Sequence, residues 1–186
     1  MEVSASERDK VSGARQDANR ARDAHAAAKA NYEKLTREHV ALGRERDSAQ
    51  TVVASTENSL THVTANGDTS EVEQAQIQLD RAKNDRELQD ARVVLAAKRV
   101  ELAEALVKVA SEHVAVTAAR VDLAKVHAIN TLDRPSLQKP RASDFELVVR
   151  NAEMQERVAQ VRADGAMQEV EIAKSSLESF HQASGN

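Results

Sequence analysis

The chain contains no cysteine and no tryptophan, and its 186 residues include one tyrosine and two phenylalanines. The absence of cysteine excludes disulfide bonds, thiol catalysis and zinc–thiolate sites. Large aromatic side chains normally supply much of the buried area of a compact globular core. Because this chain has few of them and alanine is its most frequent residue, we expect no such core.

Features of membrane-spanning and nucleic-acid-binding proteins are also missing. No apolar run reaches ~18 residues, so we expect no transmembrane segment. The net charge is −4 and the basic residues form no block, so we expect no nucleic-acid partner. The start of the given sequence does not resemble a secretory signal peptide.

Catalytic and metal-binding motifs are absent as well. The sequence has no nucleophile elbow and no phosphate loop, and its six histidines include no pair with metalloprotease spacing. An enzyme built in a helical bundle would need inward-pointing polar groups that converge on one another. The sequence therefore predicts a protein that is not an enzyme, with no metal, no cofactor and no small-molecule substrate.

The sequence does contain a sustained helical repeat. From residue 11 to residue 63, heptad positions a and d are mostly apolar and their neighbours are charged. Such a repeat over eight heptads is typical of a coiled coil. Ser4 with Glu7 fits a capping box at its start. We expect the first helix over about residues 5–64.

Residues 65–69 interrupt this repeat. They include Asn66 and Gly67, and an Asn-Gly pair tolerates left-handed backbone and favours a turn. Ser70 with Glu73 offers a second capping box. A second heptad repeat follows, and it predicts a helix over about residues 70–130.

The two repeats match each other in antiparallel order. The numbers of two residues that face each other sum to 135, as for Val63 with Val72 and for Val53 with Ala82. The midpoint of this sum falls between residues 67 and 68, inside the expected turn. The sequence therefore predicts a helical hairpin with arms of about 60 residues, each roughly 90 Å long.

A third helix is expected over about residues 144–181. The chain's two prolines, Pro135 and Pro140, lie in a linker over residues 131–142, where they end the preceding helix. Ser143 with Glu146 offers a third capping box. The heptad repeat that follows is an alanine-rich seam with a phenylalanine near each end.

The second helix has a place for the third. Every seventh residue from 88 to 123 is leucine or valine, which gives this helix a second apolar stripe and hence a second neighbour. Folded back antiparallel, the third helix would end near Leu88. We therefore expect a single elongated all-α domain over residues 1–186, an antiparallel three-helix coiled-coil bundle. A two-helix arm would project beyond it by about 20 residues, roughly 30 Å.

Two places in the hairpin are candidate functional sites. Arg46 is expected to face Gln89, and Arg86 to face an alanine, which makes a polar layer in an otherwise apolar seam. Polar core residues disfavour slipped pairings at some cost in stability. The alternative is a hinge or docking point at the base of the arm. The second site is the arm tip at Asn66, Gly67 and Asp68.

Five other residues have weaker interpretations. His25 and His39 fall on the seam, and we interpret them as core-flanking side chains whose polar edges reach solvent. Gly13, Gly43 and Gly165 lie inside helical patterns, where each costs about 1 kcal/mol against alanine. Close helix contacts are the one explanation that the sequence offers for these glycines.

The run from Arg92 to Ala105, rich in alanine and valine, resembles the alanine-rich coiled-coil lipoproteins of Gram-negative envelopes. So does the later stretch from Phe145 to Phe180. Such proteins carry a lipidated cysteine at the mature N-terminus, and Met1 stands at that place here. The resemblance implies a periplasmic spacer or scaffold near the outer membrane, with no catalytic residues. It also implies a signal sequence ending in cysteine just upstream of Glu2 in the native gene.

Two hypotheses follow for the function of a protein that acts as a structural element or as a binding partner. The first is a structural coiled coil of the periplasm or cell envelope, tethered by an N-terminal lipid. The second is a cytoplasmic adaptor that binds a partner helix through an exposed seam or through the arm. In both cases we expect a protein partner or self-association.

Overall fold

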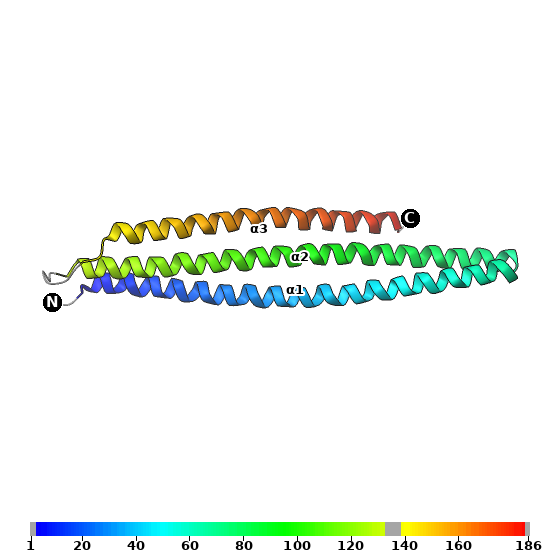
Figure 1. Ribbon diagram of the computed structural model, residues 1–186, viewed down its shortest axis with the longest axis horizontal. Helices are drawn as coiled ribbons and strands as arrows, with labels where there is room; N and C mark the ends of the chain where they lie inside the picture. Colours follow the sequence, from blue (N-terminus) through cyan, green and yellow to red (C-terminus); the bar gives the residue numbers. More distant parts are fainter. Residues whose placement is uncertain (1–2, 133–138, 185–186) are drawn as a thin grey trace. The chain divides into compact units, whose positions relative to one another are not determined.

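The computed structural model describes residues 3–132 and 139–184, and these are almost entirely helical. The three helices are α1 (Ala5–Asn66), α2 (Thr69–Asn130) and α3 (Ala142–Ser184) (Figure 1). The expected all-α architecture of three long helices is confirmed, and the helix bounds differ from the predicted ones by at most three residues. The linker residue Pro135 lies outside the described residues.

Burial follows the predicted heptads. In α1 every predicted a and d position is buried or half-buried, and the deepest are Ala18, Ala21 and Val53. In α3 the same holds for every a and d position from Phe145 to Phe180. The apolar residues repeat with the helical period and form a stripe on each helix. Burial of this stripe drives the packing, because it removes apolar surface from water.

The helix starts agree with the sequence in one case and differ in two. The Glu7 amide donates to the Ser4 hydroxyl over 3.2 Å, which confirms the first capping box. The second prediction, Ser70 with Glu73, is wrong, because α2 begins at Thr69 and Asp68 caps it. The third is also wrong, because α3 begins at Ala142 and Ser143 already lies inside the helix.

Contacts between residues divide the chain into two compact units, and each contains a stretch of every helix. Unit 1 consists of Met1–Tyr32 and Leu102–Ala166, and unit 2 consists of Glu33–Glu101 and Met167–Asn186. The single domain over residues 1–186 stays a prediction.

The core of unit 1 consists of small side chains. Its buried positions are mainly alanine and valine: Ala18, Ala21, Ala103, Val116, Val121, Val126, Ala128, Val149, Ala159 and Ala163. The one buried polar residue among the described ones is Thr117, whose hydroxyl donates to the backbone carbonyls of His113 and Val114. Small side chains let helix backbones approach closely, so this seam can be tight without aromatic rings.

Two hydrogen bonds connect the linker to the C-terminal end of α2 in unit 1. The Asn130 side-chain amide donates to the carbonyl of Pro140 over 3.2 Å. In return, the Lys139 ammonium donates to the carbonyl of Asn130 over 2.8 Å. The bond from Lys139 satisfies a backbone carbonyl that the C-terminal end of α2 otherwise leaves to water.

In unit 2, α1 and α2 pair as the sequence predicts. Val53, Leu79 and Ala82 form a buried cluster with Leu60 packed against it, so the expected meeting of Val53 and Ala82 is confirmed. An ion pair between Lys83 and Glu57 crosses the two helices beside this cluster, with nitrogen and oxygen 3.5 Å apart.

Within the same unit, α3 packs against α2 over part of its length. The Lys98 ammonium lies 2.7 Å from the Glu169 carboxylate, and Ala91 shares a hollow with Ser176. Because α3 runs antiparallel to α2 and ends at Ser184, two turns beyond Ser176, the part of α2 nearest the turn has no third helix beside it among the described residues. This is the two-helix arm that the sequence predicts.

The three glycines inside helices are not sites of close contact, so this expectation is wrong. A Cβ atom built at Gly13, Gly43 or Gly165 would meet nothing within 4 Å. Gly67 is the opposite case, because its Cβ would lie 2.7 Å from the carbonyl oxygen of Val63 and 2.7 Å from a carboxylate oxygen of Glu71.

Candidate functional site

The hairpin tip is a two-residue turn between α1 and α2. Asn66 is the last residue of α1, and Gly67 and Asp68 connect it to Thr69. The Gly67 amide donates to the carbonyl of Val63 over 2.6 Å, which closes the last turn of α1. All three tip residues, Asn66, Gly67 and Asp68, are exposed.

Glycine at position 67 is explained by the space available in the turn. An Asn-Gly pair tolerates a left-handed backbone, but no described glycine has a positive φ. Instead, the turn is so tight that a side chain at residue 67 would collide with Val63 and Glu71. The glycine is needed for space, not for backbone conformation.

Asp68 and Glu71 hold the start of α2 through a reciprocal pair of hydrogen bonds. The Glu71 amide donates to the Asp68 carboxylate over 2.9 Å, and the Asp68 amide donates to the Glu71 carboxylate over 3.2 Å. This is a capping box with aspartate as its first residue. Two acidic side chains at a helix N-terminus also interact favourably with the helix dipole.

The polar layer of Arg46, Arg86 and Gln89 lies in unit 2, and all three side chains are half-buried. Arg46 turns toward its own neighbour, because its Nε and one terminal nitrogen both donate to Asp47 Oδ1, over 3.0 and 2.6 Å. The hydrogen bond and the charge of Asp47 raise the pKa of Arg46, and the charge of Asp90 on α2 raises it further. Arg46 is therefore held against Asp47 of its own helix.

Across the seam, two polar atoms of the layer are buried without a hydrogen bond. Arg86 Nε lies 3.5 Å from Asp90 Oδ2 as an ion pair, and neither it nor Gln89 Oε1 has a hydrogen-bond partner. A buried polar atom left unpaired costs about 1–3 kcal/mol. The layer is thus a costly feature of the hairpin, and the register and the hinge interpretations both stay open.

Interhelical polar pairs in unit 1 form a second group of functional candidates. His113 Nδ1 on α2 lies 2.8 Å from Glu156 Oε1 on α3, and Arg120 on α2 donates to Glu153 on α3 over 2.7 Å. The sequence carried one signal for this group. Glu156 is a charged residue at a heptad a position, where an apolar side chain is usual.

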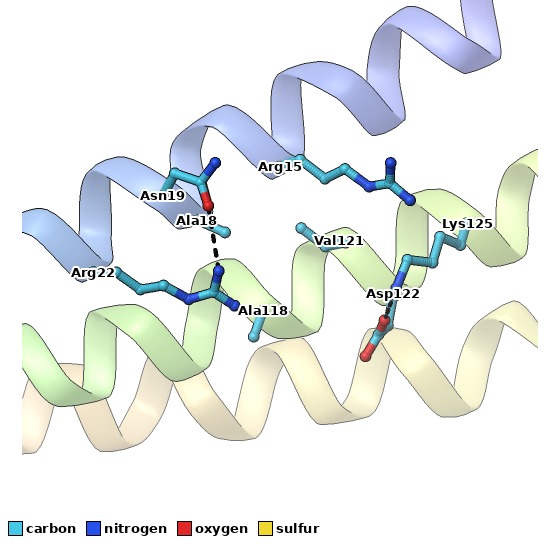
Figure 2. A pocket seen from close by; sticks show the side chains of 8 residues that line it. All are labelled: Arg15, Ala18, Asn19, Arg22, Ala118, Val121, Asp122 and Lys125. Carbon is cyan, nitrogen blue, oxygen red and sulfur yellow. Dashed lines mark hydrogen bonds and ion pairs between the residues drawn. The ribbon is translucent and has the colours of Figure 1, made fainter.

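Figure 2 shows a hollow between α1 and α2 in unit 1 that the sequence did not predict. Ala18, Ala118 and Val121 form its floor, and the long side chains of Arg15, Arg22 and Lys125 extend along its rim. Two of these cations already have partners, because Arg22 donates to Asn19 over 3.2 Å and Lys125 donates to Asp122 over 2.8 Å. The hollow exists because alanines line the seam beneath long charged residues.

No group of three or more histidine, aspartate or glutamate side chains within residues 3–132 and 139–184 is arranged to hold a metal ion. In that part of the chain no helix combines the length and the apolarity that crossing a bilayer requires. Comparison of the chain with protein-family models, with curated proteins and with solved structures finds no match.

Proposed function

We propose that this protein is a non-catalytic structural or scaffolding coiled coil. The proposal rests on which residues fill the buried heptad positions and on which polar residues pair between helices. The buried heptad positions of α1 and α3 are alanine and valine, and two polar pairs, His113 with Glu156 and Arg120 with Glu153, join α2 to α3. Side chains arranged in this way hold helices at fixed register and leave the surface for binding.

The preferred role is a periplasmic spacer, or the ectodomain of an envelope lipoprotein with a lipid on an N-terminal cysteine. The resemblance of residues 92–105 and 145–180 to alanine-rich envelope lipoproteins supports it. Membrane fractionation of cells that express the native gene, with mass spectrometry of the mature N-terminus, tests the location. A lipidated N-terminus in the envelope fraction is the expected result.

The alternative is a cytoplasmic adaptor that binds a partner helix through an exposed seam or the arm. The two-helix arm supports this alternative, because one side of its α2 has no helix beside it in the part of the chain that the structure describes. Recovery of the native protein without lipid in the cytoplasmic fraction would favour the adaptor and contradict the spacer.

A matched deletion separates the two roles by mechanism. Removing residues 54–60 together with residues 75–81 takes one heptad from each arm, and the remaining residues still face each other across the hairpin. This change shortens the arm by about 10 Å. A spacer that must reach a fixed distance should fail with the shortened arm, whereas an adaptor that binds through the tip should keep its partner. Substituting Asn66 by alanine is the complementary variant, because it changes the tip and keeps the length.

A further inference from the structure

Exposed apolar side chains in unit 1 are concentrated on one helix. Among the described residues of this unit, α2 has one large apolar residue that is exposed, Leu106, at 38%. The α3 helix has five, and their exposed fractions range from 46% to 70%: Leu147, Val148, Met154, Val158 and Val161. Such a concentration on one helix points to a binding surface.

Three of these residues form one stripe with Gly165. Met154, Val158, Val161 and Gly165 follow one another at spacings of four, three and four residues, so they lie on one face of α3. This face is turned away from the buried seam of Val149, Ala159 and Ala163. The space above Gly165 is open, because a Cβ there would have no neighbour within 4 Å.

We propose that this stripe binds the same stripe of a second copy of the chain, with the two α3 helices antiparallel. In this register, position numbers that meet across the interface sum to 319. Val158 then packs against Val161 of the second copy. Met154, the largest side chain of the stripe, packs over Gly165 of the second copy, where the surface is open.

The charges that flank the stripe support the antiparallel direction. In an antiparallel pair, the residue that precedes Val158 lies beside the residue that precedes Gly165 of the second copy. Arg157 then faces Asp164 of the second copy, and the two-fold axis forms this pair twice. A parallel pair would instead bring Arg157 against Arg162, and like charges in contact disfavour it.

The sequence continues the same pattern on both sides of the stripe. Residues 147 and 172, whose numbers also sum to 319, are leucine and isoleucine. Residues 150 and 171, which stand in the same relation as Arg157 and Asp164, are arginine and glutamate. The inference goes beyond the proposed function, since it identifies one partner and holds for a protein of either compartment.

Sedimentation equilibrium of the full chain over a wide concentration range tests the proposal. The wild type should dimerise reversibly. Val158→Glu with Val161→Glu places charges in the apolar seam, and this double variant should be monomeric with unchanged helical circular dichroism. The matched control is Val40→Glu with Val52→Glu, two valines of α1 that are 49% and 51% exposed, and it should dimerise like the wild type.

Two further variants test direction and register. Arg157→Asp should weaken the dimer about tenfold, because two attractive pairs become repulsive. Arg157→Asp combined with Asp164→Arg should restore the dimer. Since the chain has no native cysteine, Met154→Cys mixed with Gly165→Cys should give the mixed disulfide under mild oxidation.

Three outcomes would overturn the proposal. The first is a monomer at every concentration, and the second is a dimer that the double valine variant leaves intact. The third is cross-linking of each cysteine variant with itself, which indicates parallel helices. A wild type that is monomeric but binds another protein through Val158 and Val161 would also assign the stripe to a different partner.

Discussion

The His113 imidazole of α2 lies against the Glu156 carboxylate of α3, with Nδ1 and Oε1 2.8 Å apart. Glu156 occupies a position of the α3 seam where an apolar residue is usual, and its side chain is 28% exposed. The pair gives the α2–α3 contact of unit 1 a defined register. A shift of α3 by one residue would leave the carboxylate half-buried without its partner.

A double-mutant cycle with His113→Ala and Glu156→Ala should give a coupling energy of about 0.5–1 kcal/mol. The value is modest because the His113 side chain is 45% exposed and water screens the interaction. Urea unfolding at neutral pH measures all four proteins. The control cycle pairs His113→Ala with Glu153→Ala, because Glu153 bonds to Arg120 instead. Equal coupling in both cycles would contradict a specific His113–Glu156 contact.

The heptad seams and the hairpin could be predicted because they depend on residue type at fixed spacing. Val53 and Ala82 meet as the sum of 135 requires, and the turn falls at Gly67 and Asp68. These features follow from the helical period and from antiparallel symmetry. Neither depends on which rotamer a side chain adopts.

Polar partners could not be predicted in the same way, because they depend on side-chain reach and on competition between nearby groups. Arg46 bonds to its sequence neighbour Asp47, although the seam places it opposite Gln89. His113 lies outside the α1–α2 seam, so the heptad pattern gave no reason to pair it with Glu156. A lateral contact between helices becomes visible only when their rotation about their axes is known.

Replacing Gln89 by leucine should raise the free energy of unfolding by about 1 kcal/mol, because its buried oxygen has no hydrogen-bond partner. The gain comes from removing an unsatisfied acceptor and adding apolar surface to the seam. Chemical denaturation measures it. The exposed Gln78→Leu on the same helix is the control and should change stability little. A loss of stability in Gln89→Leu would show that the amide makes a contact the hairpin needs.

Replacing both arginines of the polar layer tests its role in register. Arg46→Leu with Arg86→Leu should increase the melting temperature and allow additional oligomeric states, because polar residues in a seam disfavour slipped pairings. Circular dichroism and light scattering measure the two effects. If neither stability nor oligomeric state changes, the register interpretation is wrong and a hinge or docking role is favoured.

Glycine-to-alanine substitutions should distinguish the glycines inside α1 from the glycine of the turn. Gly13→Ala and Gly43→Ala should each stabilise the protein by up to about 1 kcal/mol, since the added methyl group meets open space and restricts the unfolded chain. Gly67→Ala should destabilise it, because the new Cβ would lie 2.7 Å from the carbonyl oxygen of Val63. Thermal unfolding ranks the three variants, and a stabilised Gly67→Ala would contradict the tight turn.

The Lys98 ammonium should stabilise unit 2 over the whole neutral and mildly alkaline range. Hydrogen bonds to Glu101 and Glu169 raise its pKa above the ordinary value. Its contribution is therefore full below the unfolded pKa of about 10.4 and is lost as pH rises through the raised folded pKa. Urea unfolding measures the stability difference between wild type and Lys98→Met. This difference should stay constant up to the pKa of the unfolded state and shrink above it. Lys98→Arg is the control that keeps the charge, and a difference that already shrinks near neutral pH would contradict this assignment.

Substitutions at the start of α2 distinguish the cap that the sequence suggested from the one that the structure contains. Asp68→Ala should cost about 1 kcal/mol, because its carboxylate accepts the hydrogen bond of the Glu71 amide over 2.9 Å. Ser70→Ala should change stability by a few tenths of a kcal/mol at most, since Ser70 lies inside the helix and is exposed. Both residues are exposed and two positions apart, and they differ in the capping bond and in the charge that Asp68 places at the start of α2. If Ser70→Ala is the more costly change, α2 begins later than Thr69 and the turn is longer than two residues.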